Sequence, residues 1–211
     1  MIRAGETLLV ATRNRGKTNE FRAAFAPLGI EVRDLNEAPE AIPDIVEDGE
    51  TFADNALIKA RIVSEATGLP TLADDSGLCV DALGGAPGVY SARYAGAGAS
   101  DADNNAKLLR ELAATGLTPP DEAAAAGAPD ALSAARFVSA LVLYAPGGET
   151  KTAEGDVRGF ILPTPRGEGG FGYDPLFWLP NYGRTMAELS TEEKNAVSHR
   201  GEALRRLLAR L

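Results

Sequence analysis

Strand-like and helix-like stretches alternate along the first part of the chain. The run "TLLVAT" (residues 7–12) is continuously apolar and typical of a buried strand, and "NRGK" after it predicts a turn. The next stretch places four apolar side chains between Phe21 and Leu28 on one helical face, and Gly29 ends that helix. The run "IEVRDL" then predicts a second short strand. The order is therefore strand, turn, helix, strand.

Two later helices carry signals at both of their ends. Thr51, with an acid three residues later, predicts the start of a helix that Gly68 ends. Ser100, again with an acid three residues later, predicts the start of a helix that Gly116 ends. Between these helices, "PTLAD" and "GLCVDAL" predict short strands around an acidic turn.

The second half of the chain predicts a hairpin and a terminal helix. The runs "ARFVSALVLYA" and "TKTAEGDVRGFIL" read as strands joined by "PGGE", and residues 203–211 carry one apolar helical stripe. Residues 117–134 are rich in alanine and proline without such a stripe, which predicts a flexible surface insertion within a single domain of residues 1–211. The sum is an α/β chain with a mixed sheet.

Composition narrows the class of protein. A chain of 211 residues can bury one sizeable core or two lobes that share a sheet. No apolar run approaches the roughly 20 residues of a membrane span, and the N-terminus lacks the pattern of a secretory signal. We therefore expect a cytoplasmic protein without a membrane partner.

Charge and side-chain chemistry restrict the ligands. Cys79 and His199 are the chain's one cysteine and one histidine, so no internal disulfide and no zinc site of the Cys/His type is expected. Any metal must be held by oxygen. The net charge of −9 argues against polymeric nucleic acid as a partner, but local cations and a metal allow a single nucleotide.

The stretch "ATRNRGKT" (residues 11–18) ends like a phosphate-binding loop. A full P-loop requires glycine five positions before Gly16, where Ala11 stands. A turn between strand and helix still directs backbone amides outward, and Lys17 adds a charge suited to phosphate. The alternative is an ordinary solvated helix start.

The stretch "GEGGFG" (residues 167–172) matches the dinucleotide-binding pattern letter for letter. It follows a loop broken by proline and leads into "YDPLF" rather than a helix, so it predicts no dinucleotide fold. Its glycines allow Phe171 and Tyr173 to approach a flat ligand, and Asp174 can accept hydrogen bonds from it. A plain mobile loop is the alternative.

Acidic residues follow an apolar run at Asp74 and Asp75, with Ser76 next. Such a run commonly caps a turn. However, Glu47 and Asp48 lie in another acidic loop, and oxygen ligands from separate loops are typical of magnesium beside substrate phosphates. The patterns of aspartate-nucleophile phosphatases and of serine hydrolases are absent.

The stretch "STEEKNAVSHRGEA" (residues 190–203) gathers cationic side chains. Lys194 and Ser198 share a helical face, whereas Arg200 points elsewhere unless the helix breaks near His199 or Gly201. An ordinary solvated helix with a capping box at its start is the alternative.

Taken together, six blocks of the chain resemble the signature blocks of the inosine triphosphate pyrophosphatase family, whose members are also described as XTP/dITP diphosphatases. The blocks are "ATRNRGK", "ETFADNALIKA", "ADDSGL", "GGAPGVYSARYAG", "GGFGYDP" and "EEKNAVSHRG", and they occur in family order. The resemblance implies an elongated mixed β-sheet flanked by helices in two lobes, with a nucleotide cleft between the lobes. It also implies a homodimer.

The resemblance assigns roles to individual residues. Triphosphate binding falls to Thr12, Arg13, Asn14, Arg15, Gly16 and Lys17, although Arg13 stands where glycine is frequent in relatives. Magnesium ligation falls to Glu47 and Asp75, with Asp75 also the catalytic proton acceptor, and Ser76 contacts the substrate. Base recognition falls to Phe171, Gly172, Tyr173, Asp174, Lys194, His199 and Arg200. Placing the first ligand at Glu47 rather than at Val46 or Asp48 rests on an ungapped reading back from Thr51.

The implied reaction is hydrolysis of ITP, dITP or XTP to the monophosphate and pyrophosphate, which removes deaminated purines from the nucleotide pool. Two other functions stay open. A septum-associated nucleotide pyrophosphatase of related fold would act on modified pyrimidine or 7-methylguanine nucleotides. A binding-only nucleotide sensor would lack the catalytic acid, which is present at Asp75.

Overall fold

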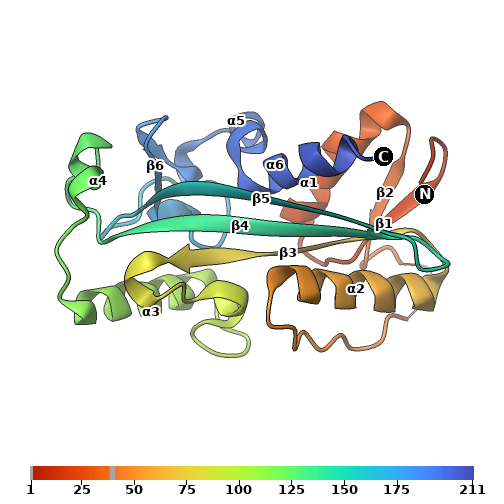
Figure 1. Ribbon diagram of the computed structural model, residues 1–211, viewed down its shortest axis with the longest axis horizontal. Coiled ribbons are helices and arrows are strands. Elements are labelled where there is room, and N and C mark those ends of the chain that lie inside the picture. Colours follow the sequence, from red (N-terminus) through yellow and green to blue (C-terminus); the bar gives the residue numbers. More distant parts are fainter. Residues whose placement is uncertain (1, 39–40) are drawn as a thin grey trace. The chain divides into compact units, whose positions relative to one another are not determined.

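The computed structural model describes residues 2–38 and 41–211, so part of the proline-marked loop before α2 lies outside the described residues. Seven strands form a mixed sheet in the order β2-β1-β3-β4-β5-β6-β7, flanked by helices (Figure 1). This confirms the predicted α/β class with a mixed sheet. A nucleotide cleft stays a prediction.

The chain divides into two compact units, which are described separately. The first unit comprises Met1–Asp75, Ser139–Gly155 and Glu202–Leu211, and the second comprises Ser76–Val138 and Asp156–Gly201. The chain passes from the first unit to the second within β3, at the bond between Asp75 and Ser76.

The first unit begins with a parallel arrangement of three strands. Its elements are β1 (Thr7–Val10), α1 (Arg15–Phe25), β2 (Glu31–Asp34), α2 (Phe52–Thr67) and the start of β3 (Thr71–Val80). Strand β1 pairs in parallel with both β2 and β3. The chain moves outward from β1 to β2 and then back past β1 to β3. Because parallel crossovers are right-handed, α1 and α2 must cover opposite faces of these strands.

The core of the first unit confirms this layering. Leu8 and Val10 of β1 pack in one cluster with Phe21 of α1, whereas Leu9 packs in another with Ala60 of α2. Successive residues of a strand point to opposite faces, so β1 is buried on both sides. This explains why its sequence is continuously apolar rather than alternating.

The ends of α2 and α3 (Asp101–Thr115) follow the predicted local signals. Helix α1 instead ends at Phe25, and a 3-10 turn, Ala26–Leu28, leads to the predicted end at Gly29. Helix α2 begins with the capping box of Thr51 and Asp54 and ends at Gly68, whose φ of +68° lies in the left-handed region. Helix α3 begins and ends in the same predicted way. These signals act between neighbouring residues, and they therefore hold whatever surrounds the helix.

The prediction of two short strands around an acidic turn is wrong. The structure has one continuous strand, β3, through Asp74, Asp75 and Ser76, and the chain turns only after Val80. A strand can carry carboxylates through a core when each of them has a cation. Both cations come from distant parts of the chain.

The remaining strands include the predicted hairpin. β4 (Ser133–Tyr144) and β5 (Thr150–Ile161) are neighbours in the sheet, and the turn between them closes through Ala145 N–H donating to Glu149 O. β6 (Phe177–Leu179) pairs antiparallel with β5, and β7 (Arg184–Thr185) with β6. The C-terminal segment forms α5 (Thr191–Val197) and α6 (His199–Leu208).

The alanine-rich segment of residues 117–134 contains α4 (Asp121–Ala125). Its side chains Ala123, Ala128 and Ala131 are buried in a cluster that includes Trp178 of β6. The indole Nε1 of Trp178 donates a hydrogen bond to Ala126 O at 2.8 Å. Small side chains thus pack this segment without an apolar stripe. Its flexibility, like the single-domain organisation, stays a prediction.

No helix among residues 2–38 and 41–211 is both long and apolar enough to cross a membrane.

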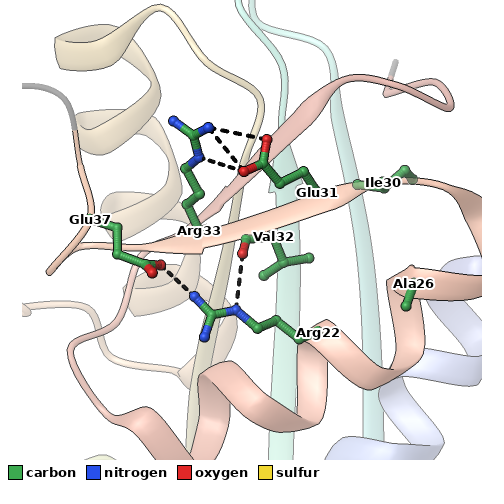
Figure 2. A pocket seen from close by; sticks show the side chains of 7 residues that line it. All are labelled: Arg22, Ala26, Ile30, Glu31, Val32, Arg33 and Glu37. Carbon is green, nitrogen blue, oxygen red and sulfur yellow. Dashed lines mark hydrogen bonds and ion pairs between the residues drawn. The ribbon is translucent and has the colours of Figure 1, made fainter.

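Strand β2 lies at one end of the sheet order, and a charged side chain covers its outer edge. Arg22 Nε donates to Val32 O at 3.1 Å, and the same guanidinium is paired with Glu37. Arg33 instead pairs with the Glu31 carboxylate. These residues line a groove of about 500 Å³ (Figure 2). Charged groups at a sheet edge oppose pairing with a strand of another chain.

We expect Arg22→Ala to promote self-association, because it uncovers the Val32 carbonyl at the edge of β2. Sedimentation velocity over a range of protein concentrations should show species larger than those of the unmodified protein. Arg33→Ala is the matched control, since it removes an arginine from the same groove without uncovering that carbonyl. Equal sedimentation of both variants would contradict this role of Arg22.

Candidate active site

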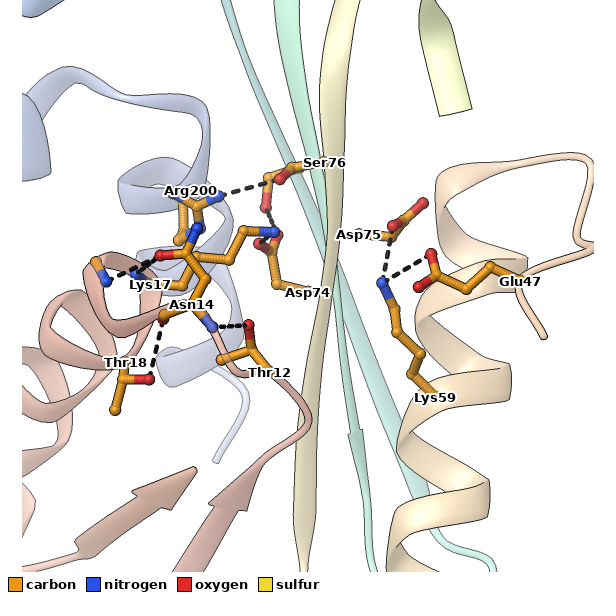
Figure 3. Close-up of polar contacts among 12 residues, drawn as sticks. Thr12, Asn14, Lys17, Thr18, Glu47, Lys59, Asp74, Asp75, Ser76 and Arg200 are labelled. Carbon is orange, nitrogen blue, oxygen red and sulfur yellow. Dashed lines mark hydrogen bonds and ion pairs between the residues drawn. The ribbon is translucent and has the colours of Figure 1, made fainter. Parts of the chain in front are cut away.

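The middle of β3 places two carboxylates on opposite faces of the strand. Asp74 points toward α1 and Asp75 points toward α2 (Figure 3). Each carboxylate meets a lysine from the helix on its own side, Lys17 for Asp74 and Lys59 for Asp75. The two adjacent acids therefore do not have to share one cation.

Asp75 belongs to a cluster with the buried Lys59 and the half-buried Glu47. Lys59 Nζ lies 2.8 Å from Asp75 Oδ1 and 3.2 Å from Glu47 Oε2, and Asn55 Nδ2 donates to Asp75 Oδ2 at 3.4 Å. Burial raises the pKa of Asp75, and Lys59 opposes that rise. Burial also disfavours the charged form of Lys59. The negative charges of Asp75 and Glu47 outweigh this effect of burial and raise the pKa of Lys59. Lys59 therefore stays charged between the two carboxylates.

Glu47 and Asp75 are the predicted metal ligands, and their geometry fits that role. Oxygens of both side chains converge on one cationic atom, Lys59 Nζ. Within the part of the chain that the structure describes, no group of three or more His, Cys, Asp or Glu side chains is arranged to hold a metal ion. Magnesium is commonly bound through one or two carboxylates together with substrate phosphates and water. The carboxylate pair suits that mode of binding.

The loop between β1 and α1 is ordered by Asn14. The Asn14 side chain accepts hydrogen bonds from Gly16 N at 2.9 Å and from Lys17 N at 3.2 Å. Lys17 Nζ lies 2.8 Å from Asp74 Oδ2, and Ser139 Oγ donates to Asp74 Oδ1 at 2.7 Å. Because the Asp74 side chain is almost fully buried, Lys17 is directed to the middle of β3, unlike an ordinary solvated lysine at a helix start.

The other predicted phosphate-binding residues lie along the same loop. Thr12 Oγ1 accepts from Asn14 N at 3.1 Å. Arg13 Nη1 donates to Leu35 O at 3.3 Å, so the guanidinium contacts the segment that follows β2. Arg15 is exposed at the first residue of α1. Contacts of these three residues with a triphosphate stay predictions.

The strand order explains how one ligand could reach both faces of β3 in the first unit. β1 ends at Val10, whose partner is Leu72, so β3 continues beyond β1 through Asp74 and Asp75. In the order β2-β1-β3 the connection after β1 leads to one side and the connection after β2 leads back past β1 to the other, and ligands bind at the carboxyl ends of strands at such switch points. Lys17 and Asp75 thus both lie near this end of the strands.

The glycine-rich loop of the second unit is held by a buried ion pair. Lys194 Nζ lies 2.6 Å from Asp174 Oδ2, which also accepts from Phe171 N at 3.0 Å. Burial raises the pKa of Asp174, and Lys194 opposes that rise. Lys194 Nζ also lies 4.4 Å from the centre of the Phe171 ring. A Cβ at Gly170 would come within 2.1 Å of Asp174 Oδ2, so glycine is required there.

A helix break brings Arg200 to the same group of residues. Ser198 has extended backbone angles and separates α5 from α6. Arg200 is 1% exposed, its Nη2 donates to Ser76 Oγ at 3.0 Å, and its Cζ lies 5.8 Å from the centre of the Phe171 ring. The alternative of one ordinary solvated helix is therefore wrong. The break occurs one residue before His199.

Two predicted base-binding residues lie deep in the second unit. His199 stacks on Phe137, with ring centres 4.9 Å apart. Tyr173 is buried, and its hydroxyl donates to Ser91 O at 2.8 Å. Both side chains support the surrounding residues, and their contacts with a base stay predictions.

Sequence reasoning missed Lys59, although the sequence holds a signal for it. Lys59 lies on the same face of α2 as the apolar residues Ala56, Ala60 and Val63 and is 8% exposed. Lysine is almost never buried unless it is paired, so a lysine within an apolar stripe indicates a buried carboxylate partner. Ser139 has no such signal, because its partner Asp74 is 65 residues away.

Comparisons with known proteins agree with one another. A family model described as the Ham1 family matches residues 8–210. The chain is 51% identical to a dITP/XTP pyrophosphatase of Streptococcus thermophilus (strain CNRZ 1066) over 97% of its length and 59% of the relative. It is 52% identical to a dITP/XTP pyrophosphatase of Geobacillus kaustophilus (strain HTA426) over 95% of its length and 91% of the relative. The chain thus spans about three fifths of the streptococcal relative.

Solved structures show the same likeness. A HAM1 protein from Coxiella burnetii superposes with a TM-score of 0.82 at 40% identity, covering 97% of this chain and 99% of that one. A structure described as a nucleoside-triphosphatase or dITP/XTP pyrophosphatase from Mycobacterium abscessus superposes with a TM-score of 0.71 at 46% identity, covering 96% and 98%.

We expect Lys59→Met to lower the free energy of unfolding by about 3 kcal/mol, because it leaves the buried Asp75 carboxylate without its cation. Urea denaturation measures this change. Adding Asp75→Asn to Lys59→Met should recover part of the loss, since an amide requires no counter-ion. A denaturation midpoint for Lys59→Met equal to that of the unmodified protein would show that Lys59 is not the stabilising partner of Asp75.

Proposed function

Since the chain belongs to the Ham1 family, we propose that it is a magnesium-dependent pyrophosphatase of dITP, XTP and ITP. The resemblance read from the six sequence blocks is confirmed by the family match, and the relatives described above are named for dITP and XTP. The observation that carries the proposal is the pair of adjacent carboxylates on β3, each facing a lysine. One carboxylate lies beside the phosphate-binding loop, and the other can hold a metal.

Lys17 is the proposed anchor of the triphosphate. Its ammonium is already held toward β3 by Asp74, so little side-chain freedom is lost when phosphate oxygens bind it. Ser139 keeps Asp74 hydrogen-bonded while Lys17 engages a phosphate. The further proposed contacts of the triphosphate in this loop are Thr12, Arg13, Asn14, Arg15 and Gly16.

Asp75 is the proposed proton acceptor. Water attacks the α-phosphorus, the bond from the α-phosphorus to the bridging oxygen breaks, pyrophosphate leaves, and the proton of the water passes to Asp75. Lys59 favours the ionised form of Asp75, which a base requires. Glu47 and Asp75 would hold magnesium, which supplies neutralisation of the negative charge on the leaving pyrophosphate.

The second unit supplies the proposed base site. Phe171 offers a flat face, while Lys194 and Arg200 are cationic donors beside it. Hypoxanthine and xanthine carry a keto acceptor at the position where adenine carries an amino donor. Adenine would therefore present a donor to donors, and sites built on hydrogen bonds can reject such a mismatch by as much as roughly 10⁴-fold.

A panel of nucleoside triphosphates with magnesium tests the proposal. We expect dITP, XTP and ITP to yield pyrophosphate and the monophosphate at the initial rate, with ATP a very poor substrate. Asp75→Asn should reduce turnover by more than tenfold with the fold retained, since it removes the proton acceptor. Orthophosphate as the initial product would show attack at the γ-phosphorus and contradict the proposal. Preference for modified pyrimidine or 7-methylguanine nucleotides would favour the septum-associated class instead.

Base recognition by Arg200 gives a separate prediction. Arg200→Ala should lower kcat/KM for ITP much more than for ATP, so that the ratio of the two falls, because only ITP offers an acceptor. Steady-state kinetics with both substrates measures this ratio. An equal loss for both would assign Arg200 to structure or to phosphate binding, given its hydrogen bond to Ser76.

A cytoplasmic homodimer is part of the proposal and follows from the family resemblance. Binding without hydrolysis is the remaining alternative. The presence of Asp75 with a buried cationic partner argues for catalysis, because a sensor requires no base at that position.

A further inference from the structure

We propose that Asp101 and Asn105 of α3 are positioning residues for the base-reading loop, defined here as residues 170–174. This inference rests on the proposed function, since it assigns the residues that set base selectivity in that site. Neither residue belongs to the predicted site.

The first observation is that α3 holds both polar backbone groups of Gly172. Gly172 N donates to Asp101 Oδ2 at 2.6 Å, and Asn105 Nδ2 donates to Gly172 O at 3.1 Å. Asp101 and Asn105 are four residues apart, so they lie on one face of the helix, one turn from each other. Gly172 has a φ of +63°, which favours glycine. The two side chains thus fix one residue at the centre of the loop.

The second observation is that Asp101 is not needed to cap its own helix. The start of α3 is closed by Ser100 and Asp103, which form a complete capping box. Asp101 is the first helical residue, where the helix dipole favours a negative charge. Its carboxylate is therefore available to accept the short hydrogen bond from Gly172 N.

The third observation concerns Asn105 Oδ1. This atom is buried and has no hydrogen-bond partner among the residues that the structure describes. The orientation of the Asn105 amide is therefore set by its other end, where Nδ2 donates a hydrogen bond to the Gly172 carbonyl.

The loop has a second anchor on its other side. The Tyr173 hydroxyl donates to Ser91 O, and Ser91 Oγ accepts from Leu78 N of β3 at 2.9 Å. Gly172 is tied to α3 and Tyr173 to the segment beside β3, and these two attachments act together with the Lys194–Asp174 ion pair to set the positions of Phe171 and Asp174. Loss of one attachment shifts the aromatic face and the acceptor together, and a displacement of about 1 Å can cost as much as 10²-fold in rate.

The experiment compares Asp101→Ala, Asp101→Asn and Asn105→Ala with a matched control, Asp121→Ala. Asp121 is likewise the first residue of a helix, α4, so its substitution removes the same charge from the same helical position. We expect kcat/KM for dITP to fall about tenfold in Asp101→Ala and that for dATP to change little. Asp101→Asn should recover much of the loss, because its amide oxygen can still accept from Gly172 N.

Two binding measurements separate positioning from general damage. Calorimetry should show weaker binding of the monophosphate IMP in Asp101→Ala, with pyrophosphate binding unchanged, since only IMP carries a base. Hydrogen exchange of the peptide covering residues 167–176 should be faster in Asp101→Ala and Asn105→Ala than in the unmodified protein and Asp121→Ala.

The outcomes distinguish this inference from the proposed function. Equal exchange in all variants, or an equal fall in kcat/KM for dITP and dATP, would overturn the positioning role. Faster exchange in a protein that hydrolyses none of the triphosphates would retain the anchoring of the loop and reject the proposed function and, with it, the assignment of base selectivity.

Discussion

The structure of the first unit depends on burying two adjacent carboxylates in one strand. Asp74 and Asp75 point to opposite faces of β3, so one cation cannot neutralise both. The strand order β2-β1-β3 solves this, because it places α1 on one face and α2 on the other, and each helix contributes a lysine. The polar centre thus requires helices on both faces of the strands.

Local features of the fold could be predicted from the sequence, because they rest on neighbouring residues. The capping boxes of α2 and α3 and the continuous apolar run of β1 belong to this group. The continuity of β3 could not be predicted in this way. "ADDSG" has the composition of a turn, and only Lys17 and Lys59, far away in sequence, make it stable as a strand.

The residues of the candidate site fall into the same two groups, those that the sequence indicates and those that only tertiary contacts define. Asp75, Lys194 and Arg200 stand in motifs that indicate their chemistry, although only the break at Ser198 brings Arg200 to Ser76. Asp101 carries no such mark, since its partner Gly172 is 71 residues further along the chain. Residues that touch a ligand can be recognised by their type and spacing, whereas residues that orient them are defined by tertiary contacts.

The packing of Trp178 has a consequence for spectroscopy. The chain holds one tryptophan, and its indole is buried against the alanines of residues 117–134 and hydrogen-bonded to Ala126 O. Tryptophan fluorescence, excited selectively at long wavelength to avoid the tyrosines, therefore arises from a single, known environment. Detachment of this segment would expose the indole to water and shift its emission to longer wavelength, so the fluorescence of the unlabelled protein reports on a part of the chain remote in sequence from Asp75.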